Sequence, residues 1–598
     1  MTNNRLLQRM ASFLISLLLL AGLALPDGIA PAAAQTESRS YLIQGQVSGG
    51  DLDMLSRLVE AYGGQVTSRM EIINAVGALL EPAAAARLMN VDEVRAVTPN
   101  AQVQVVGNDR EKAHDKDRDK EREKQEKERE KQEKEREKKG NKTPSTDYPD
   151  VTGADQVWQL GPTGAGVTVA VLDTGIEPLP GLVEGNGRHQ QERIVGWKDF
   201  VDGKSKPIDP NGHGTHIAGI IANAETGQDG EWNGMAPGVN LVGVRVLNEK
   251  GFGTYEQVIR GIEWVIKHKD RLNIQVMNLS LVSPALSPYW ADPLNQAVTR
   301  AWAEGITVVA AAGNGGSDPM TIGVPGNNPY VITAGAFTDA YTPLDFNDDY
   351  LTPFSAAGPS LDAFVKPDLL APGAHMVSTM KPSSYLARKH QANKVSNHYF
   401  SMAGTSQAAA VVSGSAALVL SQHPGLSPDQ VKYRLMYTAL PWIDPNTTEA
   451  VYSMWQQGAG RLNALDAVTG EMDGAANLGM DIWADLNGEI HYEGYSFYDE
   501  AAGEFRLQGD FGSWTGGFGS WSGGYGPWTG GFGSWSGGFG SWSGGFGSWS
   551  GGFGSWSGSQ PWTEKTLSDP AFVETFLDGE IPQGFDGAIS IGDWVEEP

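Results

Sequence analysis

The sequence predicts an α/β protein with a mostly parallel sheet covered by helices on both faces. Between residues 147 and 470, short runs rich in Val, Ile and Ala alternate with amphipathic segments. Strands buried on both faces have this pattern. The 598-residue chain is long enough for a large core and contains no cysteine, so disulfides and thiolate metal sites are excluded. Sharp changes of composition on either side of this region predict additional segments.

Five stretches are the predicted sheet strands: VTVAVLD, NLVGVRVL, IQVMNLSL, ITVVAAAGN and YVITAGAF. Between the second and the third, the residues on one helical face are Val258, Ile259, Ile262, Val265 and Ile266. Active sites of such sheets gather at the carboxyl ends of the strands. Polar motifs occur at these ends, so we expect the site there.

Two segments precede the sheet region. Residues 1–34 resemble an export signal, because Arg5 and Arg9 precede an apolar run and PAAAQ offers cleavage after Ala34. A retained anchor is the alternative, although the run is short for one. We therefore expect a secreted, extracellular protein. Residues 35–107 predict a small α+β unit, with YLIQGQV as a strand and LDMLSRLVEAYGG and EPAAAARLMN as helices.

A charged linker spans residues 108–146, where EREKQEK recurs with a period of seven. No heptad position is apolar, which excludes a coiled-coil seam. Glu and Lys or Arg pairs four residues apart favour an isolated solvated helix, and a disordered spacer fits equally well.

Three segments follow the sheet region: an acidic connector (471–510), a Gly/aromatic array (511–559) and an acidic tail (560–598). The unit FGSWSGG occurs seven times with small variations. Its glycines oppose a helix at about 1 kcal/mol each, which favours Gly-rich turns between short aromatic strands or a flexible adhesive array. Aromatic faces stack on sugars, so the array could tether the protein to a polysaccharide or a cell surface, or serve as a spacer.

The stretch NGHGTHIAG places His213 and His216 three residues apart. The two histidines could bind a metal ion together, or one could be a general base and the other a packing residue. No H-E-x-x-H motif or cysteine accompanies them, which argues against metal. Three other stretches favour a base. VAVLDTGI places Asp173 at a strand end, AGTSQAAA places Ser406 at a helix start, and VVAAAGN ends in Asn314.

These residue types fit nucleophilic catalysis. A serine hydroxyl becomes a nucleophile when an imidazole takes its proton, and a carboxylate orients that imidazole. A helix N-terminus and an asparagine amide stabilise the developing oxyanion. The single D-T-G does not support an aspartic protease, which needs two. The net charge of −27 excludes nucleic acid as a partner.

In this order and context, the region resembles the subtilisin-like serine proteases, most closely the secreted bacterial members. The resemblance implies that Asp173 orients His213, that His213 is base and then acid, that Ser406 attacks and that Asn314 holds the oxyanion. His216 matches a packing position. The resemblance extends weakly to residues 35–107, which look like an inhibitory propeptide.

The resemblance also implies a groove that binds a peptide between two strands, and a first specificity pocket with a broad preference for apolar residues. The matching substrate-binding residues are Gly251, Phe252, Gly253, Ser280, Leu281, Gly313 and Gly323.

Several residues depart from the family pattern. Gln407 replaces a methionine, Ala410 replaces a proline, and Val282 replaces a glycine and is expected to narrow the groove. EPLPGL lacks the His-Pro-Asp that supplies one calcium ligand. No cofactor is required for the chemistry. Structural calcium is compatible with an acidic, disulfide-free chain, without identifiable ligands.

The sequence thus predicts a secreted serine endopeptidase that acts on proteins and peptides and is made as a self-inhibited precursor, with residues 104–107 in its groove. Two alternatives remain. One is a surface-associated adhesive protein dominated by the repeats, and the other is a processing protease with one dedicated substrate.

Overall fold

The computed structural model describes residues 38–46, 51–105, 143–183, 193–444 and 450–507, and the backbone of the two-residue strands β22 to β27 between residues 521 and 561. The predicted signal peptide and residues 108–142 of the predicted linker lie outside the described residues. Within the described part of the chain, no helix combines the length and apolarity needed to cross a membrane.

The centre of the molecule is an eight-stranded sheet with the order β14-β13-β12-β10-β6-β8-β7, in which β15 also pairs with β13. Every pairing is parallel except that of β14 with β13. The five predicted strands form β6, β8, β10, β12 and β13, which confirms the predicted sheet. The strands are β6 (Thr168–Asp173), β7 (Ile194–Asp199), β8 (Asn240–Arg245), β10 (Ile274–Leu279), β12 (Thr307–Ala311), β13 (Ile332–Thr338), β14 (Tyr350–Leu351) and β15 (Leu369–Pro372).

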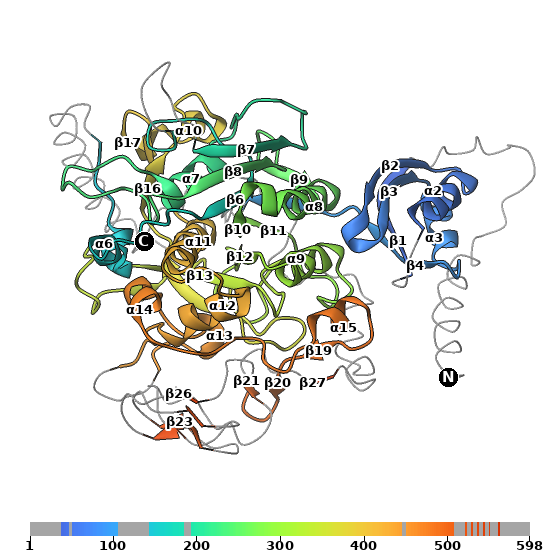
Figure 1. Cartoon of the computed structure of the whole chain (residues 1–598). Helices are drawn as coiled ribbons and strands as arrows, with labels where there is room; N and C mark the ends of the chain where they lie inside the picture. Colours follow the sequence, from blue (N-terminus) through green and yellow to red (C-terminus); the bar gives the residue numbers. More distant parts are fainter. Residues whose placement is uncertain are drawn as a thin grey trace, which may run out of the picture.

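Helices cover the sheet in two layers, as predicted (Figure 1). One layer contains α7 (His213–Ala222) and α11 (Thr405–Gln422), which pack on each other, and the other contains α8 (Tyr255–Leu272) and α9 (Pro293–Ala303). The small side chains of α11 let it lie deep against β10, β12 and β13. A Cβ at Gly414 would lie 2.4 Å from the Cβ of Met235, so this contact requires glycine.

Helix α8 shows why the apolar periodicity of the sequence predicts this helix correctly. Thr254 and Gln257 form a capping box at its start, and Asn273 ends it in the left-handed conformation. Four of the five predicted face residues, Val258, Ile259, Ile262 and Val265, are fully buried, and Ile266 packs at their edge.

The N-terminal unit is a four-stranded antiparallel sheet with two helices and its own core, in agreement with the predicted α+β composition. In Figure 1 it lies beside the larger body, on the side of α8 and α9. The sheet order is β2-β3-β1-β4. Its elements are β1 (Arg39–Gly45), α2 (Leu52–Ala61), β2 (Gln65–Met70), the 3₁₀ turn η1 (Glu71–Ile73), β3 (Ala75–Leu80), α3 (Pro82–Leu88) and β4 (Val94–Pro99).

The next strand, β5 (Gln102–Val105), leaves this unit and enters the larger body. It pairs antiparallel with β9 (Phe252–Thr254) on one side and with β11 (Leu281–Val282) on the other. The three strands form a separate small sheet.

The remaining elements of the larger body are short. They are α5 (Tyr148–Thr152), α6 (Ala154–Gln159), β16 (Met376–Thr379), α10 (Tyr385–Lys389), η3 (Gln391–Asn393), β17 (Lys394–Ser396), β18 (Tyr399–Met402), α12 (Pro428–Tyr437), α13 (Met454–Gln457) and α14 (Ala464–Thr469).

The segment expected to be an acidic connector is folded against the larger body. It contains α15 (Ile482–Leu486), β19 (Tyr492–Glu493), β20 (Ser496–Asp499) and β21 (Glu504–Leu507). Asp485 is buried and accepts hydrogen bonds from the hydroxyls of Tyr289, at 2.6 Å, and Tyr330, at 2.8 Å. These contacts join elements more than 150 positions apart, so no local pattern in the sequence reveals them.

In the repeats, two-residue strands recur at the Trp-Ser or Trp-Thr step. The strands β22 (Trp521–Ser522), β24 (Trp535–Ser536) and β26 (Trp549–Ser550) pair in parallel, as do β23 (Trp528–Thr529) and β25 (Trp542–Ser543). Alternate units therefore pair with each other. The last strand, β27 (Gln560–Pro561), pairs with β19. The role of the array stays a prediction.

Candidate active site

Asp173 and His213 meet at the carboxyl end of the central strand β6. Asp173 is its last residue and His213 is the first residue of α7. His213 Nδ1 lies 2.8 Å from Asp173 Oδ1 and 2.9 Å from Oδ2, and both side chains are buried. Because a carboxylate accepts, Nδ1 carries the proton and Nε2 becomes the basic nitrogen. Gly212 precedes His213 at φ 107°, a conformation that favours glycine.

The loop that presents His213 is organised by Asp209, a residue that the sequence analysis did not select. Its buried carboxylate accepts from the backbone N–H groups of Asn211, Gly212 and Thr215 and from the hydroxyls of Thr174 and Thr215. Burial raises the pKa of Asp209, and these hydrogen bonds oppose that shift. An aspartate four positions before the histidine, followed by Pro-Asn-Gly, is a turn signal that could have identified it.

Ser406 is the second residue of α11 and is buried. Its hydroxyl donates to the carbonyl oxygen of Ser280 at 3.2 Å. His213 Nε2 is buried and has no hydrogen-bond partner within the described part of the chain. In this conformation the hydroxyl is therefore engaged by Ser280 and is not hydrogen-bonded to the imidazole.

Asn314 follows β12 and contacts the residue before Ser406. Asn314 Oδ1 accepts from the N–H and from the hydroxyl of Thr405, both at 3.0 Å, and Gly313 N–H donates to the same hydroxyl at 3.1 Å. The amide oxygen is thus held at the start of α11, and Nδ2 is the donating end of the side chain.

A chain of buried hydrogen bonds supports the backbone at Ser406. Ser413 Oγ donates to Asn278 Oδ1, Asn278 Nδ2 donates to Ser280 Oγ, and Ser280 Oγ donates to the carbonyl oxygen of Ser406, each at 2.9 Å. Of these residues, only Ser280 was predicted from the sequence, as a substrate-binding residue. It directly precedes β11 and exchanges hydrogen bonds with Ser406.

The other predicted groove residues surround β5. Val103 is opposite Gly253, Gln104 is opposite Phe252, and Val105 is opposite Leu281. Val105 N–H donates to Gly251 O at 3.1 Å, and Ser283 Oγ donates to Gln102 O at 2.9 Å. Backbone pairing on both edges is the mode by which an extended peptide binds between two strands.

Gly313 and Gly323 both lie close to the Val282 side chain. A Cβ at Gly323 would lie 2.0 Å from Val282 Cγ2, and a Cβ at Gly313 would lie 3.8 Å from the same methyl group. The side chain of Val282 therefore occupies space that the two glycines leave open.

His216 packs away from this site. Its Nε2 lies 3.1 Å from the carbonyl oxygens of Met376 and Phe400, and burial lowers its pKa to about 3. The ring is therefore neutral at ordinary pH.

Gln407 follows Ser406 and is buried, and both polar atoms of its amide lack a hydrogen-bond partner among the described residues. Ala410 is also fully buried.

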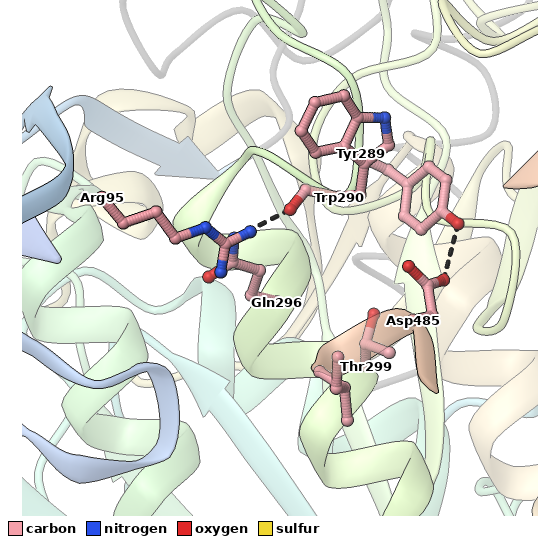
Figure 2. A pocket seen from close by; sticks show the side chains of 7 residues that line it. Arg95, Tyr289, Trp290, Gln296, Thr299 and Asp485 are labelled. Atoms are coloured by element: carbon pink, nitrogen blue, oxygen red, sulfur yellow. Dashed lines mark hydrogen bonds between the residues drawn. The ribbon is translucent and has the colours of Figure 1, made fainter. Parts of the chain in front are cut away.

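A small cavity lies at the junction of the N-terminal unit with the larger body, apart from the catalytic residues (Figure 2). Arg95 from β4 lines it together with Trp290, Gln296 and Asp485. Gln296 Nε2 donates to Trp290 O at 2.8 Å, and its Oε1 accepts from Gln44 Nε2 at 2.7 Å. Gln44 of the N-terminal unit thus contacts α9, and Arg95 of the same unit lines the cavity together with residues of α15.

The chain is similar to known proteins. The model of the subtilase family matches residues 164–470. The serine protease AprX of Bacillus subtilis is 43% identical over 314 residues, which are 52% of this chain and 67% of that protein. Subtilisin DY of Bacillus licheniformis is 39% identical over 290 residues, 48% of this chain and 88% of that protein.

Among solved structures, fervidolysin of Fervidobacterium pennivorans, a keratinolytic enzyme related to subtilisin, matches with a TM-score of 0.52 and 20% identity. The match covers 75% of this chain and 63% of that one, and it supports the fold alone. The family model covers the segment that contains Asp173, His213, Asn314 and Ser406. The chain therefore belongs to the subtilase family of serine proteases.

Proposed function

We propose that this chain hydrolyses peptide bonds through Asp173, His213 and Ser406, with Asn314 as an oxyanion donor. The observation that carries the proposal is the double contact of Asp173 with His213 Nδ1, which leaves Nε2 as a buried base without a hydrogen-bond partner among the described residues. Peptide binding would turn the Ser406 hydroxyl from Ser280 O to Nε2, since catalytic hydrogen bonds often form only in the substrate complex.

The steps follow from this arrangement. His213 Nε2 takes the Ser406 proton while Oγ attacks the scissile carbonyl carbon, and Asp173 stabilises the imidazolium. Asn314 Nδ2 and the Ser406 N–H donate to the oxyanion. His213 then gives the proton to the leaving amine, and water releases the acyl group by the same steps in reverse.

We infer that residues 35–107 are an inhibitory propeptide. Support comes from β5, which occupies the place of a substrate strand between β9 and β11. Two hydrogen bonds to helix α8 also hold the N-terminal unit against the larger body. Asn100 Oδ1 accepts from Glu256 N–H at 3.0 Å, and Glu263 accepts from Glu71 N–H at 2.8 Å. Residues 106–107, predicted to share the groove, lie outside the described residues. Cleavage there or in the linker would release activity.

The substrate preference follows from Val282. Its Cγ2 methyl group lies close to both Gly313 and Gly323 and takes up space that the two glycines leave open. We infer that the enzyme accepts small and medium apolar residues before the cleaved bond and disfavours large ones, which narrows the broad preference expected from glycines alone.

The predicted export signal supports secretion. The repeats support retention at a surface, which deletion of residues 511–557 tests. Retention lost with peptidase activity intact would assign them to tethering, and unchanged retention would leave them a spacer.

A fluorophosphonate probe tests the proposed nucleophile. The purified protein should carry the label on the peptide that contains Ser406, and Ser406→Ala should lose the label and accumulate as the uncut precursor. A Ser406→Ala protein that still takes up the probe or still matures in isolation would contradict the proposal. A digest of denatured casein tests the range of substrates, since many cuts exclude a dedicated processing protease.

A further inference from the structure

Three side chains from separate segments converge at a place that the catalytic account does not use. Asp147 directly precedes α5, Asp339 directly follows β13, and His375 lies between β15 and β16. One potential ligand atom from each lies within 4.8 Å of the others.

Both carboxylates face the same nitrogen of His375. Asp339 Oδ1 lies 2.5 Å from Nε2, and Asp147 Oδ2 lies 3.7 Å from it. One N–H can serve only one of the two. Asp339 is 3% exposed, and its second oxygen, Oδ2, has no hydrogen-bond partner within the described residues. A buried carboxylate oxygen without a donor is costly, and a cation removes that cost.

The donor set discriminates between cations. One imidazole nitrogen with two carboxylates suits zinc and metals of similar preference, whereas calcium takes oxygen ligands. Zinc bonds of roughly 2.0–2.2 Å in a tetrahedron place ligand atoms about 3.3 Å apart. The observed 2.5 and 3.7 Å bracket that spacing, so shifts below about 1 Å would admit the ion.

The surroundings hold the imidazole as metal sites do. Thr338 Oγ1 lies 3.5 Å from His375 Nδ1, where it can orient the ring from behind. The ring of Tyr341 stacks on His375 with 4.0 Å between centroids.

We propose that Asp147, Asp339 and His375 form a structural site for a divalent ion of the zinc class, separate from the catalytic residues. The ion would tie the beginning of the peptidase region to the end of β13 and to the segment before β16. Because Asp147 follows the predicted linker, the site would hold the new N-terminal end in place after the linker is cut.

Cobalt is the probe of choice, because bound Co²⁺ can be followed by its visible absorption. Tag-free, full-length Ser406→Ala protein, which should not digest itself, is treated with EDTA, dialysed and titrated with Co²⁺. We expect one Co²⁺ per chain, a tetrahedral absorption band that Zn²⁺ displaces, and a higher melting temperature with Zn²⁺.

Variants locate the site. Asp339→Asn should weaken Co²⁺ binding at least tenfold, and so should Asp147→Asn, whose half-exposed position makes it the safer variant for folding. Asp155→Asn is the matched control. It lies in a second cluster, with Asp150 and Glu231, that lacks a histidine, and it should bind Co²⁺ unchanged. Absence of a cobalt band, or a band unaffected in both Asp339→Asn and Asp147→Asn, would overturn the proposal.

Discussion

Replacing Val282 by alanine should widen the pocket between Gly313 and Gly323. The change removes two methyl groups, one of which, Cγ2, lies 2.0 Å from where a Gly323 Cβ would be. Each apolar group that the substrate can then bury is worth about 0.8 kcal/mol, so the gain for a large side chain is about 1.6 kcal/mol. This corresponds to a roughly 15-fold higher ratio of kcat/KM for Phe over Ala substrates.

The assay uses the mature enzyme and peptide p-nitroanilides that differ only in the residue before the cleaved bond, as Ala, Leu or Phe. Val282→Thr is the control, since it keeps the branched shape and should leave the Phe to Ala ratio nearly unchanged. A ratio that shifts less than twofold in Val282→Ala, or equally in both variants, would refute the reasoning.

Three more predictions follow from single buried side chains. His216 has a folded pKa of about 3 against an ordinary value of 6.5. The unfolded chain therefore binds the extra proton, and stability falls as pH drops from 6.5 towards 3, by about 2 kcal/mol at pH 5. Urea unfolding of Ser406→Ala protein at pH 7.5 and pH 5 should show this difference shrink when His216→Asn is added, and an unchanged difference would contradict it. Gln407→Met removes two unpaired amide atoms and should raise the free energy of unfolding by about 1–3 kcal/mol. Peroxide should inactivate this variant but not the unsubstituted protein. Equal stability and equal peroxide resistance of the two proteins would count against both claims. Asp209→Asn should lower kcat at least tenfold with little change in KM, because His213 loses its orientation. The control variant Asp229→Asn, at an exposed position, should leave kcat and KM unchanged. A normal kcat in Asp209→Asn would exclude a positioning role for Asp209.

Local patterns in the sequence were sufficient for the sheet and for part of the site. Continuous apolar runs predict strands buried on both faces, and the Asp173 and His213 motifs lie where such strands end and helices begin. The structure brings these two residues into contact.

Other features depend on contacts that no local pattern encodes. The family resemblance predicts that Val282 narrows the groove, but no local pattern indicates that its methyl group lies close to Gly323. Asp485 joins distant segments because Tyr289 and Tyr330 donate hydrogen bonds to it. The Ser406 hydroxyl donates to Ser280 O and not to His213 Nε2, a choice that spacing along the chain does not decide.

The central claim is that Asp173, His213 and Ser406 act as one unit, and a double-mutant cycle measures this directly. The experiment compares kcat of His213→Ala, Ser406→Ala and the double variant, each supplied as propeptide-free protein. Groups that act together are not additive, so we expect both single variants and the double variant to share one residual rate. The expected fall is on the order of 10⁶, a magnitude taken from subtilisin and not worked out from this chain. A double variant slower by the product of the two single effects would show that the residues act independently and would contradict the account.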